Sequence, residues 1–191
     1  MSIELSSLID STLFKSTTTG LSGTGKLVYS GSTLSWEQDP VVPSIGYAYL
    51  DSNSSTDFSL TSGDLTDPAD YVDMTATSMW SQKVIKNCTT NSTLGTITVT
   101  YAGVYEVAFW ANIQSDVLNT SFGIKYDVNG TKSPTSIVAT SKDTTDTHNM
   151  SAKGIVTLGA GDTIKITLAA DTTCTATVKS AGFSLNKIDN V

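Results

Sequence analysis

The sequence predicts an all-β protein built as a sandwich of two sheets, and three observations lead to this fold class. The 191-residue chain is rich in Ser, Thr, Gly and Val, and the β-branched Thr and Val fit a pleated surface better than a helix. Its second half is a series of short apolar runs separated by turn residues. Many short strands in one domain must cover one another's apolar faces and edges, which favours two packed sheets in a sandwich or jelly roll.

The first fifteen residues carry a different pattern. Leu5, Leu8, Ile9 and Leu13 fall on one helical face, and a polar stretch that contains glycine follows them. We expect this segment to be an apolar arm that anchors the protein. A helix that packs on its own domain is the alternative and stays open, because a short apolar face needs a partner surface in either case.

A domain boundary is predicted shortly after the arm. Two strand-like pieces lie between residues 26 and 37, and Pro40 and Pro43 then interrupt the β pattern. Proline has no N–H to donate to a sheet. We therefore divide the chain into an N-terminal arm or anchoring segment, residues 1–43, and a β-sandwich domain, residues 44–191.

The sandwich domain is expected to consist of consecutive short strands. The alternation in one run places Tyr105 and Phe109 on one face and Glu106 and Trp110 on the opposite face. The expected strand regions are 45–50, 57–60, 71–80, 83–88, 96–103, 104–113, 122–130, 136–141, 150–162, 163–170 and 175–188.

Charge and composition exclude several classes of partner. The formal net charge of −7 repels phosphate backbones and anionic lipid, so we expect no nucleic-acid partner. No window approaches twenty apolar residues and the first residues lack a secretion signal, so we expect a soluble protein with no membrane contact. Cys88 and Cys174 lack metal-binding spacing and are expected to stay thiols, although the sequence leaves their redox state open.

Two near-motifs do not support catalysis. Residues 20–27 match the start of a phosphate-binding loop, but Leu27 stands where the magnesium-binding hydroxyl belongs, and a strand rather than a helix is expected next. The single histidine, His148, lies in a polar segment and is expected to be a solvated loop residue. We predict no catalytic residue, no cofactor and no enzyme activity.

An acidic series could in principle bind calcium. Asp64, Asp67, Asp70 and Asp73 recur at every third residue, and carboxylates are calcium ligands. The spacing is not that of an EF-hand, and a solvated loop with a helical turn near Pro68 is the simpler interpretation. We predict no metal site, and the sequence leaves calcium binding by this loop open.

Four segments resemble the jelly-roll heads of the tumour necrosis factor (TNF) and C1q type, in the version common among bacteriophage structural proteins. The first, 101–113, has a turn glycine before an alternating strand; 156–168 is similar to their Leu-x-x-Gly-Asp hairpin; and 180–188 is similar to their closing strand. A fourth, 122–134, is similar to the Asn-Gly hairpin of the phage versions. The resemblance covers roughly residues 44–191 and implies a TNF/C1q-like jelly roll.

The resemblance also implies a homotrimer, because such heads pack three sandwiches around an axis. Tyr105, Phe109, Phe122 and Phe183 are candidates for axial or core positions. Ordinary core positions in a single sandwich are the alternative for each of them.

Two functions follow from the resemblance. The first is a bacteriophage capsid decoration, or cement, protein that binds the major capsid protein on the outside of the virion and is assembled in the host cytoplasm. The alternative is a receptor-binding or fibre-tip module that contacts host glycans through loops 51–70 and 141–150, with Trp80 and Trp110 as stacking surfaces.

Overall fold

A computed structural model describes part of the chain, in two units. These units are residues 1–41 and 42–191, and each is described by itself. The described residues are 25–30, 33–38, 45–52, 55–76, 78–134, 137–141 and 143–190. Leu5, Leu8, Ile9 and Leu13 lie outside them, so the apolar arm stays a prediction.

The described part of the first unit is a β-hairpin. Strands β1 (Gly25–Ser30) and β2 (Thr33–Gln38) pair antiparallel, from Gly25 opposite Gln38 to Ser30 opposite Thr33. A phosphate-binding loop would need a helix to begin here, so the strand at Gly25–Ser30 contradicts that motif.

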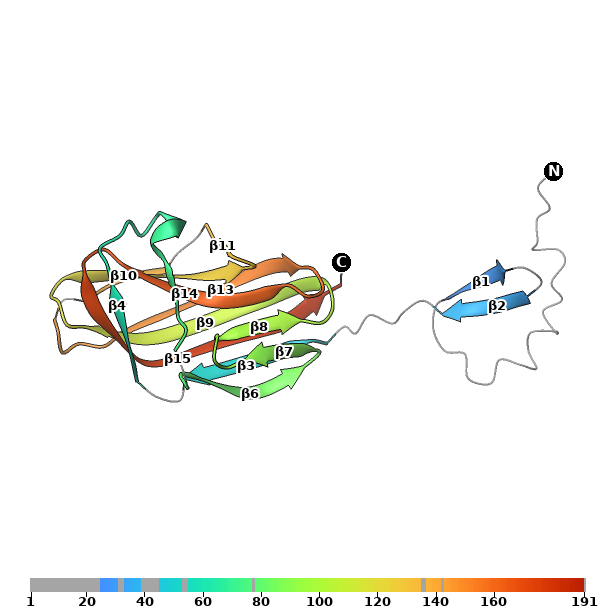
Figure 1. Cartoon of the computed structure of the whole chain (residues 1–191), viewed down its shortest axis with the longest axis horizontal. Helices are drawn as coiled ribbons and strands as arrows, with labels where there is room; N and C mark the ends of the chain where they lie inside the picture. Colours follow the sequence, from blue (N-terminus) through green and yellow to red (C-terminus); the bar gives the residue numbers. More distant parts are fainter. Residues whose placement is uncertain are drawn as a thin grey trace. The chain divides into compact units, whose positions relative to one another are not determined.

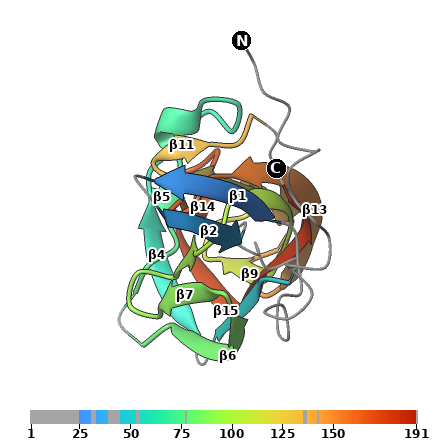
Figure 2. The same cartoon turned by 90° about the vertical axis from the view of Figure 1, so that its right-hand side faces the viewer.

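The second unit is a sandwich of two antiparallel sheets (Figures 1 and 2). The strands of the six-stranded sheet are β3 (Tyr47–Ser52), β4 (Thr56–Leu60), β6 (Trp80–Lys86), β9 (Gly103–Ser115), β13 (His148–Leu158) and β15 (Cys174–Asp189). Their order is β13-β9-β15-β3-β6, with β4 also paired to β15.

The seven-stranded sheet forms the other layer. Its strands are β5 (Val72–Asp73), β7 (Cys88–Asn91), β8 (Thr96–Val99), β10 (Thr120–Val128), β11 (Thr131–Lys132), β12 (Ile137–Ser141) and β14 (Thr163–Ala170). Their order is β11-β10-β14-β8-β7, with β12 also paired to β10 and β5 to β14. The prediction of an all-β jelly-roll sandwich is confirmed.

The core lies between the two sheets and follows the alternation read from the sequence. Along β9 every second residue is buried from Gly103 to Ser115, and the residues between them are partly exposed. Tyr105, Phe122 and Phe183 are fully buried and Phe109 is nearly so, so all four candidate residues lie in this core. Phe183 on β15 stands directly opposite Phe109 on β9.

Two predicted turns are present, and one of them joins different elements from those expected. Asn129 and Gly130 both have positive φ angles (51° and 88°) and close the β10–β11 hairpin, as predicted. The turn at Gly161 connects β13 to β14, which belong to different sheets. The expected hairpin at 156–168 is therefore wrong: this segment crosses from one layer to the other. The carboxamide of Asn129 holds the two turns together, since it donates to Asp162 Oδ1 (2.8 Å) and accepts from the Thr163 N–H (2.8 Å).

Other expectations need smaller corrections. The predicted strand at 71–80 is reduced to Val72–Asp73, and Trp80 begins a separate strand, β6. Cys88 and Cys174 are buried free thiols, one in each sheet, and burial raises the pKa of Cys88 to about 11. In the part of the chain that the structure describes, no helix has the length and apolar character needed to cross a membrane.

Candidate functional site: the outer faces of the two sheets

His148 does not lie in a solvated loop, which corrects the prediction. It is the first residue of β13, opposite Ile113 on β9, and is only partly exposed. Its Nε2 atom is buried and has no hydrogen-bond partner among the described residues.

The acidic series is dispersed over separate structural roles. Asp64 Oδ1 accepts from the Thr66 N–H (2.8 Å) and hydroxyl (2.7 Å), and Asp70 Oδ2 accepts from the Asp64 N–H (2.6 Å). Asp67 accepts from the Ala69 N–H (2.8 Å) and caps a 3₁₀ turn at Pro68–Asp70, where a helical turn was expected. In the described ranges no three His, Cys, Asp or Glu side chains lie close enough together to hold a metal ion.

Residues 61–74, which we call the strap, run along the seven-stranded sheet: Val72–Asp73 pair with β14 as strand β5, and the residues before them cover part of the outer face. The strap projects on the side of β11 in both views of the sandwich (Figures 1 and 2). A Cβ atom at Gly123 on β10 would overlap the hydroxyl of Tyr71, so the strap lies directly on this strand. The Tyr71 hydroxyl donates to the Leu65 carbonyl (2.7 Å), which closes the strap on itself.

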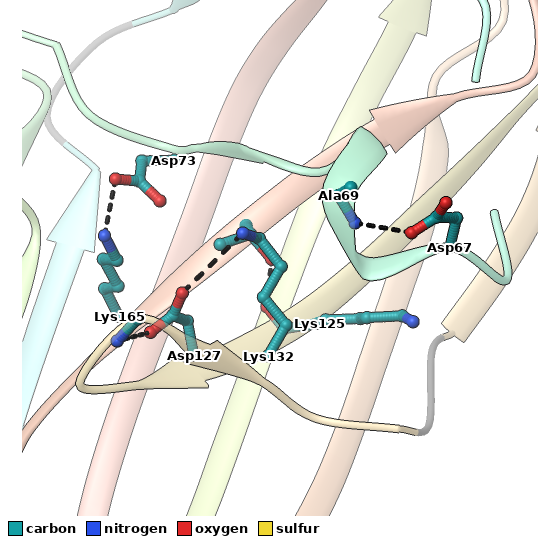
Figure 3. Close-up of polar contacts among 9 residues, drawn as sticks. Asp67, Ala69, Asp73, Lys125, Asp127, Lys132 and Lys165 are labelled. Atoms are coloured by element: carbon teal, nitrogen blue, oxygen red, sulfur yellow. Dashed lines mark hydrogen bonds and ion pairs between the residues drawn. The ribbon is translucent and has the colours of Figure 1, made fainter. Parts of the chain in front are cut away.

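The strap buries a lysine that points away from the core. Lys125 is 1% exposed, and its Nζ lies 4.7 Å from the centroid of the Tyr71 ring and 3.4 Å from the Thr66 carbonyl oxygen. Figure 3 shows this side chain extending towards the 3₁₀ turn. A cation over an aromatic face is stabilised by the ring quadrupole, so Lys125 ties the strap to the sheet.

Two further charged contacts hold this face together (Figure 3). Lys165 on β14 pairs with Asp73 of the strap (Nζ–Oδ2 2.5 Å). Asp127, which is buried, accepts from the Gly130 N–H (2.6 Å) and lies 3.9 Å from Lys132 Nζ. Most charges on this sheet thus have partners within the same chain.

The outer face of the six-stranded sheet, which we call the open face, is built differently. The strand register places Ser151, Trp110, Gly182 and Asp51 side by side across β13, β9, β15 and β3. A Cβ atom at Gly182 would overlap the Trp110 indole, so the ring lies against the β15 backbone at this glycine. The adjacent row is Lys153, Ala108, Ser184, Tyr49 and Val84.

A hollow of about 480 Å³ lies on the open face beside Trp110. Tyr49 forms one side of the hollow and Lys153 lines it as well. Partial burial, followed by the charge of Asp51 and a hydrogen bond to it, raises the pKa of the Tyr49 hydroxyl, which also interacts with Trp110. Both aromatic side chains line the hollow and contribute to its apolar surface.

A second hollow, of about 450 Å³, follows the edge of the sandwich. Tyr126, Ile137 and Gly154 line it, together with Phe109, Ala152 and Lys153, which also line the first hollow. Ile155 on the edge strand β13 borders it and is 69% exposed, the highest value among the exposed large apolar residues that the structure describes. The two hollows thus form a continuous surface around β13.

The part of the open face formed by β13, β9 and β15 carries few charges, and Asp51 on the neighbouring strand β3 lies beside it. Its positions on the described strands β13 (149–157), β9 (106–112) and β15 (180–186) include only two charged residues, Glu106 and Lys153. Depletion of charge around aromatic residues is typical of the centre of protein interfaces. This arrangement suits contact with another protein surface.

Sequence reasoning identified part of this site. It placed Trp110 on the face of its strand away from Phe109, which is confirmed. It also expected Trp80 to be an exposed stacking surface, which is wrong, because Trp80 is buried (3% exposed) and donates to the Met74 carbonyl (2.7 Å). Tyr49 and Gly182 were missed. A glycine inside the apolar run 180–188 was the available signal, because strand glycines mark close approach of another group.

No protein-family model and no curated protein sequence matches the chain. Similar solved structures include the Eiger TNF of S. frugiperda, with a TM-score of 0.53 and 13% identity over 77% of this chain and 94% of that one. The globular domain of zebrafish complement 1qA has a TM-score of 0.53 and 14% identity over 77% and 99%. Murine APRIL at pH 5.0 has a TM-score of 0.48 and 12% identity over 75% and 98%. Residues 42–191 thus have the TNF/C1q-like jelly-roll fold, and the similarity says nothing about phages.

Proposed function

We propose that this protein is a non-enzymatic module that associates into a homotrimer through the open face. The observation that carries the proposal is the hollow lined by Tyr49 and Trp110, on a face where β13, β9 and β15 carry only two charged residues. The TNF/C1q-like fold supports three copies rather than two, because such domains are typically homotrimers.

A three-fold ring also suits the arrangement of the surfaces. Copies in a closed ring of three contact each other through two different patches, one on each neighbour. The open face supplies one patch, and the edge hollow with Ile155 supplies a second that is continuous with it.

Sedimentation equilibrium of the full chain tests this association. A mass three times that of one chain at micromolar concentration is the expected result. A single-chain mass at every accessible concentration would overturn the proposal.

We further propose that the trimer decorates the outer shell of a bacteriophage capsid, with residues 1–43 anchoring it to the major capsid protein. Support comes from the separate N-terminal unit and from the apolar pattern of Leu5, Leu8, Ile9 and Leu13. The virion exterior is accordingly the proposed location.

Imaging capsids that lack the protein, after the purified chain is added, tests this role. Ordered density at three-fold or quasi-three-fold positions is expected for the full chain. A full-length variant with serine at the four apolar arm positions should remain trimeric but leave the shell bare. Unchanged binding of this variant would remove the anchoring role from the arm, and a bare shell with the unaltered chain would overturn decoration itself.

The glycan-binding alternative now depends on Trp110. An indole beside a hollow can stack on sugar rings, and Asp51 and Lys153 supply polar groups nearby. A trimer that buries Trp110 leaves no such platform. Glycan binding by the intact protein, lost in Trp110→Ala, would favour this alternative.

A further inference from the structure

Glu106 and Lys153, the two charged residues that β9 and β13 place on the open face, form an ion pair with each other. Lys153 Nζ on β13 lies 3.2 Å from Glu106 Oε1 on β9, and the two side chains are 69% and 39% exposed. An exposed pair of this kind contributes little to the stability of a single folded chain, because water screens it and both side chains lose rotamer freedom. Its effect on folding therefore does not account for its place on this face.

The position of Lys153 links the pair to association. Lys153 lines both hollows, so a copy that covers either hollow also covers this side chain. Covering the pair removes water from both charges, and a desolvated charge is tolerated only while it keeps its partner. Any docking orientation that separates Lys153 from a carboxylate, or sets like charges together, is then strongly disfavoured.

We propose that the Glu106–Lys153 ion pair determines the orientation in which copies of this chain associate. This inference rests on the association proposed above and names the residues that make it specific. The apolar hollows supply attraction with little directional preference, whereas the pair rejects orientations that leave a charge unmatched.

Charge exchange in the full chain tests this role. Glu106→Lys and Lys153→Glu each place two like charges on the open face, and the double variant restores an opposite pair in the reverse sense. Each single variant should raise the concentration needed for trimerisation at least about 100-fold, and the double variant should return it to within about tenfold of the unaltered chain. Sedimentation velocity over a concentration series measures both effects.

Two controls separate orientation from other effects. Asp146→Lys changes the net charge by the same amount as Glu106→Lys, but at an exposed residue of the β12–β13 loop outside both hollows, and it should leave trimerisation unchanged. Urea unfolding should show that the variants stay folded. If a charge reversal prevents folding, the neutral pair Glu106→Gln and Lys153→Gln replaces it, with a smaller loss expected for each alone.

The outcomes distinguish this inference from the proposal on which it rests. Single variants that trimerise as well as Asp146→Lys would overturn the role of the pair while the trimer stands. Loss in both single variants without recovery in the double variant would overturn it as well, because the two charges would then act separately. An unaltered chain that stays monomeric would remove the association itself.

Discussion

The outer faces of the two sheets share one local feature, an aromatic ring over a strand glycine, but differ in what surrounds it. On each face an aromatic ring lies on a strand glycine: Tyr71 on Gly123 and Trp110 on Gly182. Tyr71 comes from the strap, which buries Lys125 beneath it. Trp110 comes from the adjacent strand β9, and the hollow beside it holds no other part of the described chain.

The difference shows which outer face is covered by residues of the same chain. On the seven-stranded sheet the strap covers part of the outer face. The charges of Lys125, Lys165 and Asp73 have partners within the chain. On the six-stranded sheet an aromatic platform remains beside two hollows, at a place where charge is scarce. A partly exposed apolar surface of this kind is stabilised when another surface covers it. We therefore expect the first face to affect the stability of one chain and the second to affect the proposed association.

The largest effect is expected from a charge at the centre of the open face. Trp110→Glu should raise the concentration for trimerisation at least about 100-fold, since a buried interface tryptophan commonly contributes about 2–4 kcal/mol. Sedimentation velocity measures the change. Leu94→Glu, at an exposed apolar residue in the β7–β8 turn, should have no such effect. Equal behaviour of the two variants would place the interface elsewhere.

The next effect concerns the covered face. Gly123→Ala should lower the free energy of unfolding by about 1–3 kcal/mol, because the new methyl group overlaps the Tyr71 hydroxyl and the strap must shift. Urea unfolding at a concentration where the chain is monomeric measures this loss. The trimer should form at its normal concentration. Weakened association in Gly123→Ala would show that the two faces are coupled and would break the comparison.

The sequence predicted the elements that depend on neighbouring residues, such as strand alternation and tight turns. The alternation from Tyr105 to Trp110 assigned each side chain to the correct face of β9, and Asn129-Gly130 predicted its turn. The strap could not be predicted, because the local pattern places Lys125 on an exposed strand face. Its burial depends on residues 61–74, which lie more than fifty positions earlier in the sequence. Gly182 and Tyr49 on the open face were missed for the same reason. Gly182 meets Trp110 only through the register of β9 with β15, which is a pairing of distant segments.

A smaller effect should come from removing the buried charge under the strap. Lys125→Met keeps most of the side-chain volume, and replacing a buried charge by an apolar group is often close to neutral, so the unfolding free energy should change by less than about 1.5 kcal/mol. The strap should nevertheless loosen, because it loses the Thr66 and Tyr71 contacts. Faster amide hydrogen exchange confined to residues 61–74 is the expected readout. Exchange unchanged from that of the original chain would show that Lys125 does not hold the strap.

The smallest effect is a dependence of the strap on acid. The hydrogen bonds from the Thr66 N–H and hydroxyl hold the pKa of Asp64 below its ordinary value of 3.8, with a smaller contribution from Lys125. Because the folded pKa is the lower one, this stabilisation is present above pH 3.8 and is lost as the pH falls through the folded value. Amide exchange of the strap, followed from pH 5 downwards and corrected for intrinsic rates, should therefore accelerate relative to that of β9. Asp64→Asn keeps an oxygen acceptor but cannot titrate, so it should remove the part of this acceleration that belongs to Asp64. An identical acid response in the variant would assign the loosening to other carboxylates.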